Sequence, residues 1–185
     1  MAEPETDRVV PASPQRRSDF RRRAQELLLL EVAIADPELG CHNRAYLVHR
    51  ARDEMARRQR YGQRLSLLLV EADRPTRGGA GDPLREIASI ARLSVRPTDI
   101  VARWQAGEFV LLLPCTGLAG ATRLARRLCA AVAAAQLSAA GGQLSASIGI
   151  ATSLGRRDPL ELLVQRARSG LAEARAAGGG RIGIG

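Results

Sequence analysis

Two short apolar runs joined by a four-residue turn constrain the fold of this chain more than any other feature. Residues 100–104 and 109–113 have the composition of β-strands, and Gln105-Ala106-Gly107-Glu108 between them has that of a tight turn. A connection this short allows only an antiparallel hairpin. Segments with helical periodicity lie on both sides, so the hairpin is predicted at the centre of an α/β sheet, with its polar turn exposed at the edge of a cleft.

The residues before the hairpin predict two helices and a strand. Asn43 and Asp82 are placed to cap helices that run to about residue 60 and about residue 95. The first has Leu47, Val48, Ala51 and Met55 on one face, and the second has Leu84, Ile87, Ala88 and Ala91 on its inner face. Residues 65–70 form a continuous apolar run, which is typical of a central strand covered on both faces.

The residues after the hairpin predict two more helices and two strands. One helix follows Pro114, with its apolar stripe at Leu118, Ala121, Leu124, Ala125, Leu128 and Val132. Residues 144–152 form a strand, and Asp158-Pro159-Leu160-Glu161 resembles a capping box that opens the last helix. Residues 181–184 are expected to add a short edge strand. The whole order predicts one α/β domain with a mixed central sheet over residues 36–185, flanked by helices.

The N-terminal region is expected to differ from this domain. Residues 1–17 contain three prolines and no periodicity, which predicts a disordered tail. Residues 18–35 predict a helix too apolar to stand alone, which either packs on the domain or pairs with a second copy as a signalling stalk. A homodimer is one expectation, and the sequence does not choose between the two arrangements.

Composition limits the class of protein. No apolar run approaches the roughly 20 residues that span a bilayer, and the N-terminus lacks the apolar segment of a signal peptide, so a cytoplasmic protein without a membrane partner is expected. The formal charge of +9 suits a phosphate-bearing partner, but the arginines are spread over every predicted helix, so nucleic-acid binding is not favoured. The three cysteines have no metal-ligand spacing and are expected to be reduced and packed as small hydrophobic residues.

Two acidic residues, Glu71 and Asp73, follow the apolar run of the predicted central strand. That position suits a metal or substrate site in α/β proteins, and it equally suits a solvated strand end. The glycine-rich connection that follows, residues 74–81, lacks the Lys-Ser/Thr ending of a phosphate-binding P-loop.

Several motifs in order resemble the GGDEF domain, the fold of diguanylate cyclases, which make cyclic di-GMP from two GTP. DPELGCHNR at residues 36–44 resembles the family's opening D-x-L-T-G-L-x-N-R, and LLLVEAD at 67–73 resembles its L-L-L-L-D-I-D strand. Gly81-Asp82 resembles its G-D-x-x-L segment, SIGIA at 147–151 is similar to its S-I-G-I-A strand, and Ala174-Arg175 with Gly178 resembles its A-K-x-x-G ending. The resemblance covers about residues 36–182 and implies the GGDEF fold.

The resemblance also implies that catalysis is lost. Gln105, Ala106, Gly107, Glu108 and Phe109 occupy the position of the G-G-D/E-E-F signature, and only Glu108 and Phe109 fit it. The family's paired glycines let the nucleotide approach the turn, which side chains at Gln105 and Ala106 obstruct. Its third position supplies an acid that holds a divalent cation, and here that residue is Gly107. The loop after Asp73, residues 74–80, is shorter than the family's and lacks its guanine-binding Asn and Asp and its phosphate-binding Lys. No catalytic residue, cofactor or metal ligand is therefore predicted, although Glu71 could replace one metal-binding Asp.

A second family site is retained. Arg96-Pro-Thr-Asp99 fits the R-x-x-D inhibitory site, through which many GGDEF domains bind cyclic di-GMP, and Arg127, with Arg126 next, falls where the family often adds an arginine. The same residues could have purely structural roles, Arg96 in ending its helix and Asp99 in ordering the turn.

The leading hypothesis is therefore a catalytically inactive GGDEF domain that acts as a cyclic di-GMP receptor and signals to an unknown protein partner or a second copy. The alternatives are a nucleotide-independent interaction scaffold with this fold, a basic nucleic-acid-associated module, and residual GTP binding without turnover supported by Glu71, Asp73 and Glu108.

Overall fold

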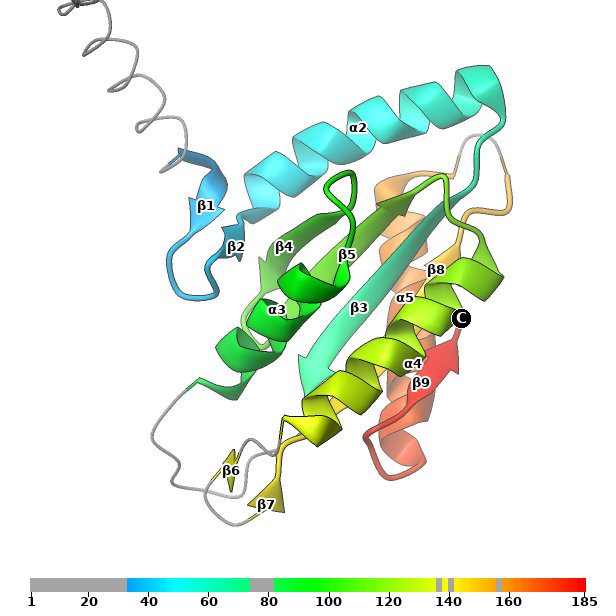
Figure 1. Cartoon of the computed structure of the whole chain (residues 1–185). Coiled ribbons are helices and arrows are strands. Elements are labelled where there is room, and N and C mark those ends of the chain that lie inside the picture. The colour runs from blue at the N-terminus through cyan, green and yellow to red at the C-terminus, as the bar shows by residue number, and fades with distance from the viewer. Residues whose placement is uncertain (1–32, 74–81, 136–137, 140–141, 156–157) are drawn as a thin grey trace, which may run out of the picture. The chain divides into compact units, whose positions relative to one another are not determined.

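A seven-stranded mixed sheet organises residues 34–185 in the computed structural model, which describes residues 33–73, 82–135, 138–139, 142–155 and 158–185 (Figure 1). Its helices are α2 (Arg44–Tyr61), α3 (Pro83–Ser94), α4 (Leu118–Ala134) and α5 (Leu160–Ala176). Its strands are β1 (Ala35–Asp36), β2 (Cys41–His42), β3 (Leu65–Ala72), β4 (Ile100–Gln105), β5 (Glu108–Pro114), β8 (Ala146–Thr152) and β9 (Ile182–Ile184), while β6 (Ser138–Ala139) and β7 (Gly142–Gln143) form a separate ribbon.

The strand order is β1-β2-β4-β5-β3-β8-β9, so the predicted hairpin, β4–β5, lies in the middle of the sheet. The pairs β4–β5, β5–β3 and β3–β8 are antiparallel, and β2–β4 and β8–β9 are parallel. The prediction of a mixed α/β sheet is confirmed. Strand β3 is buried along residues 65–70, as its continuous apolar run predicts, because it lies between β5 and β8 and has a hydrophobic cluster on each face.

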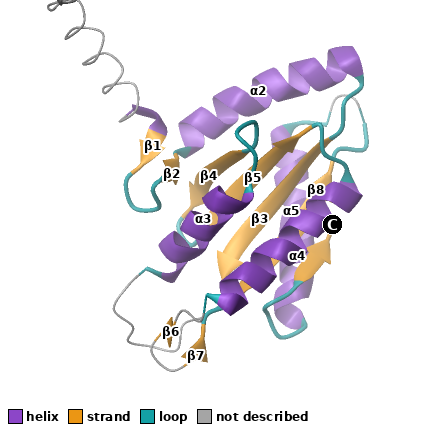
Figure 2. Ribbon diagram, in the orientation of Figure 1, coloured by secondary structure: helices purple, strands orange, loops and turns teal. Residues whose placement is uncertain are grey.

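Two hydrophobic clusters divide the helices between the faces of the sheet. Successive apolar residues of β3 belong to different clusters, because successive side chains of a strand point to opposite faces. Helices α3 and α4 supply one cluster, and α2 and α5 supply the other. Figure 2 shows α3 and α4 on the near side of the sheet and α5 behind it.

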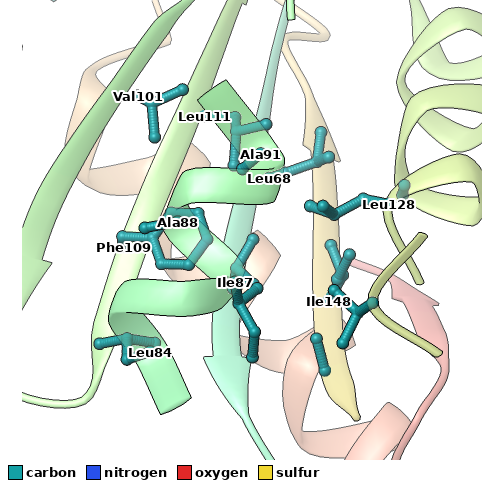
Figure 3. Close-up of a cluster of buried hydrophobic side chains, with 14 of the residues drawn as sticks. Leu68, Leu84, Ile87, Ala88, Ala91, Val101, Phe109, Leu111, Leu128 and Ile148 are labelled. Atoms are coloured by element: carbon teal, nitrogen blue, oxygen red, sulfur yellow. The ribbon is translucent and has the colours of Figure 1, made fainter. Parts of the chain in front are cut away.

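Local capping explains where α2 and α3 begin. The side chain of Asn43 accepts a hydrogen bond from the N–H of Tyr46 at 2.9 Å, and that of Asp82 accepts one from Leu84 at 3.0 Å. Gly62 ends α2 in the left-handed conformation at φ 68°. The four inner residues predicted for α3 are all buried, beside Phe109 and Leu111 of β5 (Figure 3).

Helix α2 contains two buried charged residues that the apolar pattern did not predict. Glu54 pairs with Arg57 at 3.1 Å, and Arg58 donates a hydrogen bond to the backbone carbonyl of Gly155. Glu54 is therefore neutralised by an arginine, and Arg58 is hydrogen-bonded, as buried charged and polar groups require.

Several predicted boundaries are wrong by a few residues. Ala35, assigned to the preceding helix, lies in β1, which forms a short antiparallel pair with β2. The strand predicted from residue 144 begins at Ala146. The hairpin strands include Gln105 and Glu108, so the turn itself is only Ala106-Gly107.

Asp158 does not cap α5, contrary to the prediction of a capping box. The N-cap is Pro159, without a side-chain cap. The Asp158 carboxylate accepts hydrogen bonds from the N–H groups of Leu154 and Gly155 at 2.8 and 3.0 Å. It thus binds donors of the preceding loop instead of those of the helix.

Two apolar residues are more exposed than predicted. Leu118 is 39% exposed, because it begins α4 at the end of the sheet instead of over its face. Cys115 is exposed and adopts a positive φ of 52°, so it is not packed as a small core residue. Cys41, by contrast, is buried as expected.

Residues 1–32, which hold the predicted tail and most of the predicted N-terminal helix, lie outside the described residues, as does the glycine-rich connection at 74–81. No helix in the described part of the chain is long and apolar enough to cross a membrane.

Candidate functional site

The two ends of the β4–β5 hairpin carry the residues that the sequence singled out. At the turn end, Gln105 pairs with Glu108, and Gly107 has a φ of +79°, which an L side chain rarely adopts. Gln105 and Ala106 are exposed beside it. Of the signature positions, Phe109 is fully buried in the core on the α3–α4 face (Figure 3), so its role is packing.

The acidic residues at this end are held by arginines of α5. Glu71 of β3 lies directly opposite Glu108 of β5 in the sheet register. Arg168 donates two hydrogen bonds to Glu108, at 2.7 and 2.9 Å to its two carboxylate oxygens. Arg175 pairs with Glu71 at 3.1 Å. The sequence predicted neither pair, although Arg175 belongs to one of the family motifs, because nothing in a linear pattern pairs residues on β3 and β5 with a helix near the C-terminus.

Asp73 has a different set of partners. It accepts hydrogen bonds from the hydroxyls of Ser145 and Ser147, the first at 2.6 Å, and from the N–H of Gly180 at 2.6 Å. These donors come from the start of β8 and from the turn that follows α5. Asp73 therefore ties the end of β3 to two other segments of the chain.

These residues do not fit a metal site. A Mg²⁺ ion at a nucleotide site needs one or two available carboxylates, while waters and phosphates supply its other ligands. The carboxylates of Glu71 and Glu108 are bound by guanidinium groups, and Asp73 is bound by hydroxyl and backbone donors. Within the described residues, no group of three or more His, Cys, Asp or Glu side chains is arranged to hold a metal ion.

At the other end of the hairpin, Arg96 and Asp99 close the turn between α3 and β4. The N–H of Arg96 donates to the Asp99 carboxylate at 2.9 Å, and the N–H of Asp99 donates to the carbonyl of Arg96 at 3.0 Å. Asp99 therefore has the structural role that the sequence offered as an alternative. The Arg96 side chain is exposed.

Arg96 and Asp99 also line a cavity of about 150 Å³ against α4. Its lining residues are Ser94, Arg96, Asp99, Leu113, Thr116, Gly120, Arg123, Leu124 and Arg127. Arg127 donates a hydrogen bond to the carbonyl of Ser94, which holds its guanidinium at the end of α3.

The structure distinguishes between Arg127 and Arg126, the two arginines that the sequence predicted beside the R-x-x-D residues. Arg127 lines the cavity together with the R-x-x-D residues, whereas Arg126 does not. Successive helical residues point about 100° apart, so only one of the two can face the same neighbour. Arg123 was missed, although its position one turn before Arg127 places it on the same side of α4.

The residues that line this cavity carry a net positive charge. Its lining contains the three arginines at 96, 123 and 127 and one carboxylate, Asp99. Burial raises the pKa of Asp99 above its usual value, against the opposing effects of the Arg96 N–H and the Arg96 charge.

A larger hollow, of about 440 Å³, lies at the end of the sheet where α2 and β8 finish and α4 starts. It is lined by Arg58, Gly62, Gln63, Arg64, Leu118, Thr152, Ser153 and Leu154. None of these residues belongs to the motifs singled out from the sequence.

A family model and two similar relatives of this chain point to the same family. A family model described as diguanylate cyclase, GGDEF domain, matches residues 33–181. Response regulator PleD of Caulobacter vibrioides is 34% identical over 160 residues, and diguanylate cyclase DgcP of Pseudomonas aeruginosa is 37% identical over 161 residues. These alignments cover 80% and 82% of this chain but only 35% and 24% of the relatives, so the chain spans about a third or less of their length.

Solved structures agree with this match. The coiled coil and GGDEF domain of DgcB from Caulobacter crescentus, in complex with c-di-GMP, has a TM-score of 0.80 over 92% of this chain and 95% of that one, at 16% identity, which supports the fold alone. Diguanylate cyclase SiaD of Pseudomonas aeruginosa, in complex with its activator SiaC, has a TM-score of 0.77 at 29% identity over 92% of this chain and 69% of that one.

Proposed function

Because the chain belongs to the GGDEF domain family, we propose that it is a catalytically inactive member that serves as a receptor for cyclic di-GMP. The observation that carries this proposal is the shared cavity. Arg96 and Asp99 come from the turn before β4 and Arg127 comes from α4, yet all three line one hollow. The bond from Arg127 to the Ser94 carbonyl fixes one of the cations before any ligand arrives.

The chemistry of the cavity matches a guanine nucleotide with phosphodiester groups. A guanidinium donates two parallel hydrogen bonds to guanine O6 and N7 or to a phosphate. A carboxylate accepts from the guanine N1 and N2 hydrogens, and Asp99 retains lone pairs for this beyond the one bonded to the Arg96 N–H. The excess of arginine over aspartate in the lining favours a dianionic ligand, and cyclic di-GMP carries two phosphates.

The size of the cavity limits how such a ligand binds. At about 150 Å³ it is smaller than the roughly 300 Å³ or more of pockets that enclose a drug-sized molecule. It holds part of a cyclic dinucleotide and leaves the rest exposed. The exposed part is then available to a second protein surface, either a partner or another copy of this chain.

The turn end of the hairpin supports the proposal that the protein is inactive. Gln105 and Ala106 carry side chains where the family has glycines, and Gly107 supplies no carboxylate. The remaining acids, Glu71 and Glu108, are already paired with arginines. A triphosphate bound here would lack a metal ion to neutralise it.

Calorimetric titration with cyclic di-GMP tests the receptor role. The wild-type protein is expected to bind, and R96A, D99N and R127A are each expected to lose about tenfold or more in affinity. R126A is the matched control, because this neighbouring arginine does not line the cavity and its loss should leave the affinity unchanged.

Binding that survives R96A and R127A, or falls equally with R126A, would contradict the assignment of the site. No binding of cyclic di-GMP by the folded wild-type protein would favour the rival role, a nucleotide-independent scaffold. Inactivity is tested separately: incubation with GTP and Mg²⁺, followed by chromatography, should yield no cyclic di-GMP.

A further inference from the structure

Two carboxylates face each other across the turn end of the sheet. Glu71 and Glu108 are directly opposed partners on the antiparallel strands β3 and β5. Opposed residues of such a pair point to the same face of the sheet, so the two charges repel each other. The Glu108 side chain is only 8% exposed and that of Glu71 is 25% exposed, so water screens this repulsion poorly.

Helix α5 places one cation against each of these carboxylates. Arg168 and Arg175 are seven residues apart, which is two helical turns, so both lie on the same side of α5. The buried residues between them, Leu171 and Ala174, pack α5 against the domain core. Arg168 binds both oxygens of Glu108, and Arg175 binds Glu71.

We infer that Arg168 and Arg175 take the place of a divalent cation at this end of the sheet. The acids there are therefore neutralised without a metal ion. Two guanidinium groups supply the same total charge as one divalent ion, and here they neutralise Glu108 and Glu71. The family resemblance implies a divalent cation at this position, but the residues present do not fit one. The two ion pairs explain how Glu71 and Glu108 can both be ionised there without a metal ion.

Asp73 strengthens the inference. It is the third carboxylate at this end, and its two oxygens are engaged by Ser145, Ser147 and the N–H of Gly180. A cation entering the site would therefore have to displace existing partners from all three acids. The inference does not depend on cyclic di-GMP binding, because Arg96, Asp99 and Arg127 contribute nothing to it.

Thermal unfolding with and without divalent cations tests the inference. The wild-type melting temperature should be the same, within about 1 °C, in EDTA and in millimolar Mg²⁺ or Mn²⁺. The double variant R168M/R175M should melt about 5 °C or more lower in EDTA, because it leaves two carboxylates unpaired. Mn²⁺ should then restore at least half of that loss, which removal of a merely structural contact would not produce.

Two further variants test whether the effect comes from losing the positive charges at positions 168 and 175 or from any change of an arginine. R168K/R175K keeps both charges and should remain insensitive to Mn²⁺, although it loses the two-point contact with Glu108. R85M removes an exposed arginine of α3 and should change neither stability nor cation response.

Stabilisation of the wild-type protein by Mn²⁺ would overturn the inference, and so would a folded double variant that does not respond to the cation. If the double variant does not fold, the single variant R175M takes its place, since its partner Glu71 is the more exposed acid. Electron paramagnetic resonance should then detect Mn²⁺ bound to R175M and not to the wild type, and absence of binding to R175M would overturn the inference.

Discussion

The three cysteine thiols lie in different environments, and this decides their reactivity. Cys41 is buried, Cys129 is partly buried beside the Ala146 carbonyl, and Cys115 is exposed. Burial raises the pKa of both Cys41 and Cys129 to about 11, with a further contribution from the charge of Asp36 in the first case and of Asp73 in the second. These two thiols therefore stay protonated at neutral pH.

Alkylation of the native protein by iodoacetamide at pH 7.5 is expected to label Cys115 at least about tenfold faster than Cys41 or Cys129, because only exposed thiolates react readily. Peptide mass spectrometry measures the three rates. Denatured protein is the control and should label all three alike. Equal rates in the native protein would contradict the assigned environments.

Asp158 is a second residue whose role depends on its surroundings. Burial acts to raise its pKa, but the N–H groups of Gly155 and Leu154 and the charge of Arg166 outweigh that effect and hold the pKa below the usual value. A carboxyl group with a lowered pKa in the folded state stabilises the fold when it is ionised. Its contribution is complete above the unfolded pKa of about 3.9 and is lost as the pH falls through the folded-state value.

The variant D158A is expected to lose about 1–2 kcal/mol of unfolding free energy at pH 7, since two backbone donors lose their acceptor. Urea titrations of both proteins should show this difference shrinking below about pH 4, as the wild-type carboxylate becomes protonated. A difference that stays constant between neutral and acidic pH would contradict a role for the ionised group.

At the scale of elements, the contact of α5 with β8 depends on glycine. A Cβ at Gly149 would overlap the backbone of Ala167 and Leu171, and Gly170 of α5 similarly meets Gly183 of β9. The helix therefore lies closer to these strands than any larger side chain would allow. This approach brings the C-terminal half of α5, with Arg168 and Arg175, to the acids of β3 and β5.

Gly149→Ala is accordingly expected to cost about 3 kcal/mol or more of unfolding free energy, or to prevent folding, because backbone must move to admit one methyl group. Gly107→Ala is the control. A Cβ added at Gly107 would meet no neighbouring atom within 4 Å, so this variant should cost only the about 1–2 kcal/mol of its positive φ. Urea unfolding measures both, and similar losses for the two variants would contradict the close approach.

The elements themselves were largely predictable, because their causes are local. Asn43 and Asp82 cap helices through N–H groups two or three residues away, and the hairpin follows from two apolar runs around a short turn. One error arose where a residue had several partners within reach. This residue is Asp158, whose carboxylate binds the loop before it and not the helix after it.

At the scale of the whole molecule, the charge of +9 is distributed and partly neutralised. Arg50 and Arg57 flank Glu54, Arg103 pairs with Asp36, and other arginines pair with acids on different elements. In the part of the chain that the structure describes, these arginines are therefore partly neutralised by acids and less available to a phosphate backbone.

Binding to duplex DNA is expected to be weak and non-specific, with a dissociation constant above about 10 µM at roughly 0.15 M salt. Fluorescence anisotropy with a labelled duplex, over a range of salt concentrations, measures this. A polyanion such as heparin should compete as well as DNA does. Tight binding that persists at high salt and prefers one sequence would contradict this expectation.

The sequence alone was enough to determine the family, the mixed α/β sheet and the loss of the signature residues at 105–107. Each of these depends on residues that are neighbours in the chain. Only the tertiary structure decided which arginines of α4 line the cavity beside Arg96 and Asp99, namely Arg123 and Arg127 and not Arg126. It also decided that Arg168 pairs with Glu108 and that Arg175 pairs with Glu71. The physical reason is that these contacts depend on strand order, register and helix rotation, which bring together side chains that are far apart in the chain.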